Sequence, residues 1–180
     1  PGTIGQASLV LRHDSQQQIE GGLVQIDAIN LAALTPWVDL APESWAGLWT
    51  QAAPQGYLRQ VQGRFQGQWP NLQLQNWRAQ ASAVSWQAGA VSKDFPLARW
   101  PGVSGLSAEL EGSASALHGS VRVESGELYW PGLWEEPKHK ISLFKAEVSA
   151  QQGSDGRRLQ LKSAQLLTDP ARADFRLNWE

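Results

Sequence analysis

Hydrophobic and polar residues alternate along most of this chain with a period of two, which is the period of a β-strand. In the run LSAELEG, residues 106–112, leucine and alanine alternate with serine and glutamate. The same alternation occurs in residues 57–69, 117–124, 144–151 and 171–179. In the first of these, Tyr57 and Val61 have the parity of Phe65, and Arg59 is the exception. One apolar and one polar face is typical of an antiparallel sheet.

Short turn sequences separate the alternating runs. Gly-Ser, Pro-Gly, Gly-Ser-Asp-Gly and Asp-Pro occur at residues 112–113, 131–132, 153–156 and 169–170. This spacing predicts strands that pair with their neighbours in the chain, as in a meander. We therefore expect a mainly β fold of at least seven strands: a curved antiparallel meander sheet with an apolar concave face and one helical connection. Residues 101–180 would form the meander, and residues 1–100 would contain strands and a helix.

Three runs change parity partway along their length. The apolar positions shift after Ala83 to Val84, after Val123 to Leu128 and after Leu161 to Ala164. A slip of one residue moves every following side chain to the other face of a strand, so each change predicts a β-bulge or a sharp bend. Repeated bulges curve a sheet, and the curvature is therefore part of the prediction.

Residues 30–56 depart from the strand pattern. Asn30 can cap a short helical turn, Pro36 lies within that turn, and PESWAGLWTQA predicts a helix over residues 42–52. An apolar stripe with i, i+3, i+4 spacing runs along this helix and consists of Trp45, Leu48 and Trp49. Such stripes usually pack on a core, so we expect the helix to close one end of the sheet.

The composition excludes several classes of function. The 180 residues carry a formal charge of −2 and include no cysteine and no methionine. Without cysteine there are no disulfides and no thiolate metal sites, and the balanced charge argues against a nucleic acid partner. No run approaches the roughly 20 apolar residues of a membrane span. Because the chain begins at Pro1 and lacks methionine, we interpret it as a single segment, residues 1–180, of a longer protein.

Candidate catalytic residues are few and poorly arranged. His118 has Ser120 and Arg122 as neighbours on a polar strand face, and no G-x-S-x-G sequence occurs. The carboxylates Glu109 and Glu111 alternate with apolar residues, which is typical of a solvated strand face and not of a glycosidase pair. We therefore expect no enzymatic activity, no cofactor and no metal site.

Two further features have more than one interpretation. Lys138, His139 and Lys140 form a basic cluster that either contacts anionic head groups or lies in a solvated turn. The chain also has 10 Trp against 4 Phe and 2 Tyr. Tryptophan is used in cores, in sugar-binding platforms and at the margins of apolar surfaces. A carbohydrate-binding or structural β-sandwich is therefore an alternative function.

Residues 95–152 resemble the AsmA-like envelope proteins, and the YhdP branch in particular. The resemblance rests on P-x-x-x-G-L-S at residues 101–107, L-x-G-S at 117–120 and W-P-G-L-W at 130–134. It also rests on APQGYLRQVQGRFQGQW at residues 53–69, a turn leading into an amphipathic strand that ends in tryptophan. The resemblance implies a protein anchored in the bacterial inner membrane, with repeated β units that conduct phospholipid across the periplasm toward the outer membrane.

The resemblance and the alternation together define a candidate lipid groove. Its partners would be phospholipid acyl chains, neighbouring β units of the same chain, and the inner membrane through an anchor outside this segment. The candidate groove residues are Val61, Phe65, Leu110, Val121, Val123, Val148, Leu161, Phe175 and Leu177. The opposite face would present to solvent Arg64, Glu109, Arg122, Glu147 and Arg176.

Overall fold

The computed structural model describes residues 5–40, 43–90, 99–130, 138–153, 156–169 and 171–179. The strands are β1 (Ala7–His13), β2 (Ile19–Asn30), β3 (Gln55–Gln66), β4 (Gln73–Trp86), β5 (Gly89–Ala90), β6 (Arg99–Trp100), β7 (Gly102–Gly112), β8 (Ala116–Tyr129), β9 (Lys138–Gly153), β10 (Gly156–Thr168) and β11 (Arg172–Trp179). The helices are the 3-10 helix η1 (Leu31–Leu40) and α1 (Glu43–Ala52).

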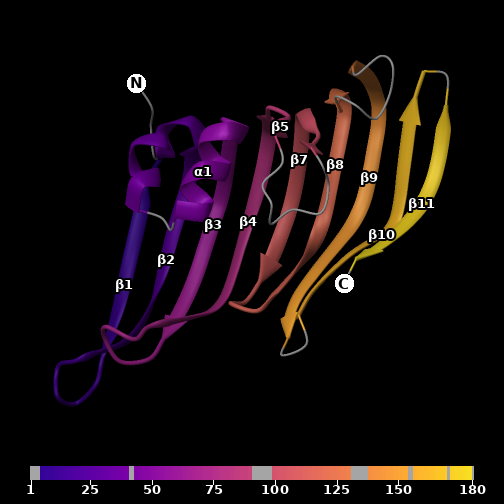
Figure 1. Cartoon of the computed structure of the whole chain (residues 1–180). Coiled ribbons are helices and arrows are strands. Elements are labelled where there is room, and N and C mark those ends of the chain that lie inside the picture. The colour runs from indigo at the N-terminus through magenta and orange to yellow at the C-terminus, as the bar shows by residue number, and fades with distance from the viewer. Residues whose placement is uncertain are drawn as a thin grey trace.

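Nine of these strands form one antiparallel sheet in the order β1-β2-β3-β4-β7-β8-β9-β10-β11. Each strand pairs with the next along the chain, and only the short β5-β6 ladder is separate. Figure 1 shows the resulting open sheet, with β1 and β11 at its two edges. The predicted mainly β fold and curved antiparallel sheet are confirmed, and the described strands β7 to β11 pair consecutively as a meander.

The three predicted bulges are present. Ala83, Ser125 and Ser163 each have left-handed backbone conformation, with φ of 51°, 57° and 50°. The pairing register shifts beside Ala83 and beside Ser163. Two further left-handed residues, Gln60 with φ 50° and Gly105 with φ 74°, lie in β3 and β7. These two were not identified from the sequence, because the single exception at Arg59 was not interpreted as a bulge and no change in apolar parity marks Gly105.

The bulges keep the apolar side chains on one side of the sheet. Residues that face each other across an antiparallel pair share a face. Val123 pairs with Leu106 on one side and with Phe144 on the other. Leu106 then pairs with Val84, and Phe144 pairs with Leu166. We call this side the apolar face and the opposite side the polar face.

The bulge at Gln60 corrects one sequence expectation. Tyr57 was expected on the same face as Val61, but the bulge lies between them. Beyond it, Leu58 pairs with Ala81 and occupies the apolar face. Tyr57 instead lies beside Arg59, whose guanidinium carbon is 5.6 Å from the centroid of the tyrosine ring. The exception that Arg59 made in the sequence pattern was the trace of this bulge.

The two helices connect β2 to β3 and cover one end of the apolar face. The Asn30 side chain accepts a hydrogen bond of 3.0 Å from the backbone N–H of Ala32, which confirms its capping role. The predicted helix over residues 42–52 is confirmed as α1. A bond of 2.8 Å from the Gln87 N–H to the Ala52 carbonyl ties α1 to the end of β4. Ile29 and Val84, near the ends of β2 and β4 that adjoin the helices, are only 8% and 7% exposed, and we call this part of the apolar face the covered region. Figure 1 shows the two helices in front of β2 and β3.

Candidate functional site

The register places all nine candidate groove residues on the apolar face. One row of paired residues crosses the sheet from β3 to β10 and shows this directly. It consists of Gly63, Trp77, Gly112, Leu117, Ala150 and Leu159. Seven of the candidates lie an even number of residues from this row on their own strands. Leu177 follows from its pairing with Leu161, and Phe175 lies two residues before Leu177 on the same strand. The sequence prediction of a shared face therefore agrees with the observed pairing.

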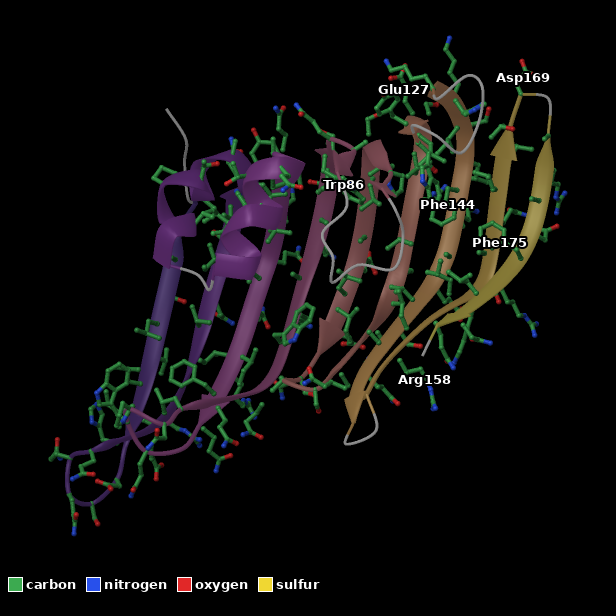
Figure 2. All side chains as sticks on the ribbon, viewed as in Figure 1. Trp86, Glu127, Phe144, Arg158, Asp169 and Phe175 are labelled. Carbon is green, nitrogen blue, oxygen red and sulfur yellow. The ribbon has the colours of Figure 1, made fainter. Side chains whose placement is uncertain are left out.

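Exposure varies strongly among these nine residues. Val123 is 1% exposed and is the largest fully buried side chain in the described part of the chain. Phe175 and Leu177, on the edge strand β11, are 39% and 49% exposed. Figure 2 labels Phe175 near this edge of the sheet. The other six are half-buried. Exposure of the candidate residues is thus lowest at Val123 on β8 and highest on β11.

The same face is also open at the other edge. Leu9 pairs with Val24 and Leu11 pairs with Gly22, so both leucines belong to the apolar face. Both are exposed. Sequence reasoning did not select them, because the run Leu9-Val10-Leu11 does not alternate. A run of apolar residues near an expected sheet edge is the signal that could have identified them.

The polar face carries the residues expected there. Arg64, Glu109, Arg122, Glu147 and Arg176 are all exposed, with side chains on the polar face. A depression of about 630 Å³ lies on this face over β4, β7, β8 and β9. Its charged lining residues are Arg78, Glu109, Glu111, His118, Glu147 and Lys162.

The histidine in this depression forms a single ion pair. His118 Nε2 lies 2.7 Å from Glu111 Oε1, and both side chains are mostly exposed. The described part of the chain holds no group of three His, Cys, Asp or Glu side chains arranged to bind a metal. The pair is therefore a solvated surface contact.

Lys138, His139 and Lys140 do not converge on one site. Lys138 and Lys140 lie on the polar face with Glu127, and Lys138 Nζ is 2.9 Å from Glu127 Oε2. The hydrogen bond from Lys138, its charge, and the charge of Lys140 lower the pKa of the Glu127 carboxyl. His139 pairs with Leu128 and lies half-buried on the apolar face. Figure 2 shows Glu127 at the end of the sheet opposite Arg158.

The described tryptophan side chains do not form a platform. Trp77 Nε1 donates to the Ser113 carbonyl at 3.2 Å, and Trp86 Nε1 donates to the Pro101 carbonyl at 2.8 Å. Both rings are half-buried on the apolar face, as is expected of tryptophan at the margin of an apolar surface. Of the tryptophans whose side chains are described, Trp69 is the exposed one.

The helices in the described ranges are too short or too polar to cross a membrane. A family model described as YhdP protein matches residues 4–179 of the chain. No curated protein and no solved structure matches it. The match covers nearly the whole chain and agrees with the motifs at residues 101–107 and 130–134. This chain therefore belongs to the YhdP protein family, a family of the Gram-negative cell envelope.

Proposed function

We propose that this segment handles phospholipid without catalysis, by binding acyl chains along the apolar face. In this proposal it is the periplasmic part of a protein anchored in the inner membrane, and it conducts phospholipid toward the outer membrane. One observation carries the proposal. The apolar face is continuous across nine strands, and its side chains are exposed at both edges, at Leu9 and Leu177.

An acyl chain needs apolar surface and no directional partner. Each buried methylene contributes about 0.8 kcal/mol, so a chain that covers several rows of the sheet gains substantial free energy. Rows on one face of a strand are about 6.8 Å apart, so an extended chain contacts several of them. A large apolar surface that is exposed to solvent usually marks a binding site.

The edges of the sheet support neighbouring β units as partners. Outside their pairs with β2 and β10, strands β1 and β11 present a row of free backbone groups. Such edges pair readily with further strands. In this proposal, neighbouring units of the same chain continue the sheet on both sides and extend the apolar face into a longer groove.

The carbohydrate-binding alternative has less support. A sugar platform needs two or three exposed, coplanar aromatic rings. Among the tryptophans whose side chains are described, Trp77 and Trp86 are held by carbonyl acceptors on the apolar face. A structural β-sandwich would instead cover Phe175 and Leu177 with a second layer.

Site-specific photo-crosslinking in the full-length protein tests the proposal. A benzophenone amino acid replaces Leu177 or its neighbour Arg176, which lie on opposite faces of β11. We expect phospholipid adducts from position 177 and few from position 176. Val121 and Arg122 provide a second matched pair on β8, where the apolar residue is half-buried.

Two outcomes would contradict lipid binding on this face. Equal labelling from positions 176 and 177 would mean that the contact is not oriented. Crosslinks from position 177 to protein alone would mean that the face is a closed core. A correctly folded parent is checked by its thermal unfolding before either result is interpreted.

A further inference from the structure

Four arginines lie on the polar face of the first four strands, one in each of four successive rows. Arg12 pairs with Gly21 in the first row, and Arg64 pairs with Leu23 in the second. Arg78 pairs with Gln62 in the third, and Arg59 pairs with Gln80 in the fourth. The rows are about 6.8 Å apart along the strands, or slightly less at the bulge. We call these four residues the arginine strip.

Within β1 to β4 the other side chains in these rows are neutral, and the first carboxylates in register with them are Glu109 and Glu111 on β7. Besides glycines and small residues, the neutral side chains include Gln25, Gln62, Gln66, Gln73, Asn76 and Gln80. The two carboxylates of β2 close to them both lie at irregular positions outside the paired rows: Glu20 at the register shift beside His13, and Asp27 opposite Gln60. Within β1 to β4 the strip therefore has no carboxylate in register with it.

Neutral groups hold two of these arginines in place. Arg59 Nε donates to Ser82 Oγ at 3.1 Å, and its guanidinium lies over the Tyr57 ring. Arg78 Nε donates to Gln62 Oε1 at 3.0 Å. The carboxylate opposite Arg78 on β7, Glu111, bonds to His118 instead. Neutral partners orient a guanidinium without cancelling its charge, so the strip is pre-organised for an anion.

The polar face of the later strands is different. There Arg122 forms an ion pair with Glu124, Lys138 with Glu127 and Arg172 with Asp174. Among the described ion pairs, none includes a residue of the arginine strip. The chain as a whole carries −2, whereas on β1 to β4 the four arginines exceed the two carboxylates, Glu20 and Asp27, so the positive charge there is a local feature.

A small apolar patch lies within the strip. Val10 pairs with Leu23 on the polar face, between the row of Arg12 and the row of Arg78. Val10 is 58% exposed, and Leu23 is half-buried beside it. An apolar pair flanked by arginines matches a protein segment that carries both carboxylates and an apolar side chain. A simple polyanion would leave this patch uncovered.

We propose that the arginine strip binds an acidic segment of a partner protein in extended conformation. Alternate side chains of an extended segment are about 6.8 Å apart on one face, which matches the spacing of the rows. Carboxylates at those positions would form bidentate bonds with the guanidinium groups, and an apolar residue would cover Val10 and Leu23. This interaction uses the polar face and does not depend on lipid binding to the apolar face.

Peptide binding to the full-length protein tests this proposal. The probe is a fluorescent dodecapeptide in which glutamate alternates with threonine and one central threonine is replaced by leucine. The test variant is Arg59→Gln/Arg64→Gln/Arg78→Gln. The control variant, Lys145→Gln/Lys162→Gln/Arg176→Gln, removes the same charge from the polar face of β9, β10 and β11. All six side chains are exposed, so both variants are expected to fold.

We expect the test variant to raise the Kd for the peptide at least tenfold and the control variant to raise it less than twofold. Replacing the central leucine of the peptide by threonine should weaken binding to the parent about threefold. Among the described contacts, the Arg64 side chain forms no hydrogen bond or ion pair. Arg64→Gln alone should therefore raise the Kd for the peptide, but by less than the triple variant does.

Three results would overturn the proposal. Equal losses in the two triple variants would mean that only total charge matters. Absence of peptide binding to the parent at low salt would remove the site. Binding of phosphatidylglycerol vesicles with the same dependence on Arg59, Arg64 and Arg78, and no preference for the peptide, would assign the strip to an anionic lipid surface instead.

Discussion

The two ends of the apolar face have the same sequence pattern and opposite exposure. At one end, where the helices adjoin β2 and β4, Ile29 and Val84 are buried. At the other, Phe175 and Leu177 on β11 are exposed. Alternation of apolar and polar residues specifies which face a side chain occupies. It does not specify whether that face becomes a core or a surface, because that depends on a second layer of chain.

The lengths of the connections account for this difference. Residues 31–54 connect β2 to β3, and this length allows two helices to fold back over the sheet. Residues 169–171 connect β10 to β11 and suffice only for a turn. The first region therefore resembles an ordinary two-layer fold, and the second offers its apolar side chains to another molecule.

The largest expected effect is the difference in stability between an added carboxylate at the covered end and one at the open end. Val84→Asp places a carboxylate in the covered region without a partner, which should lower the free energy of unfolding by several kcal/mol. Leu177→Asp places the same charge at an open edge and should change it by less than about 1 kcal/mol. Urea denaturation followed by tryptophan fluorescence measures both. Similar losses in the two variants would show that β11 is also covered.

A second prediction concerns the start of the covering segment. Asn30→Ala removes the acceptor for the Ala32 N–H and should destabilise this segment by about 1 kcal/mol. Hydrogen exchange should then increase in residues 31–52 and stay unchanged in residues 172–179. An increase of equal size in β11 would mean that the two ends unfold together. Asn178→Ala, on the polar face of β11, is the matched control.

A third prediction concerns backbone strain, which we expect to be the same at the two ends. Ala83→Gly and Ser163→Gly each relieve a left-handed residue in a strand, one near the covered end and one near the open end. The strain energy that is removed exceeds the entropic cost of ordering a more flexible glycine. The free energy of unfolding of each variant should therefore rise by about 0.5 kcal/mol. Thermal unfolding of the two variants compares them. A gain at one position only would show that the cover, and not the backbone, sets the strain.

The smallest expected effect is a pH dependence at Glu127. Its pKa lies below the ordinary value of 4.5 because Lys138 bonds to the ionised carboxylate. Its contribution to stability is therefore present above pH 4.5 and is lost as the pH falls through the lowered pKa. Glu127→Gln should flatten the acid side of the stability profile slightly. An acid limb of the same slope in Glu127→Gln and in the parent would contradict this contribution.

The sequence predicted this fold well because its signals are local. A break in apolar parity at Ala83, Ser125 or Ser163 is visible in a few residues, and each corresponds to a left-handed residue. The breaks at Gln60 and Gly105 were missed because polar residues or glycine stand where a change of face would otherwise show. The separation of His139 from Lys138 and Lys140 follows from strand alternation alone and could have been predicted.

The sequence by itself determined which side chains share a face, where the strands bend and where the helix lies. Each of these depends on neighbours a few residues apart, through the two-residue period of strands and the capping of helices. Only the tertiary structure decided which part of the apolar face is covered, and that Arg12, Arg59, Arg64 and Arg78 lie in successive rows. Burial and charge patterns across a sheet depend on register between strands, which joins residues far apart in the chain.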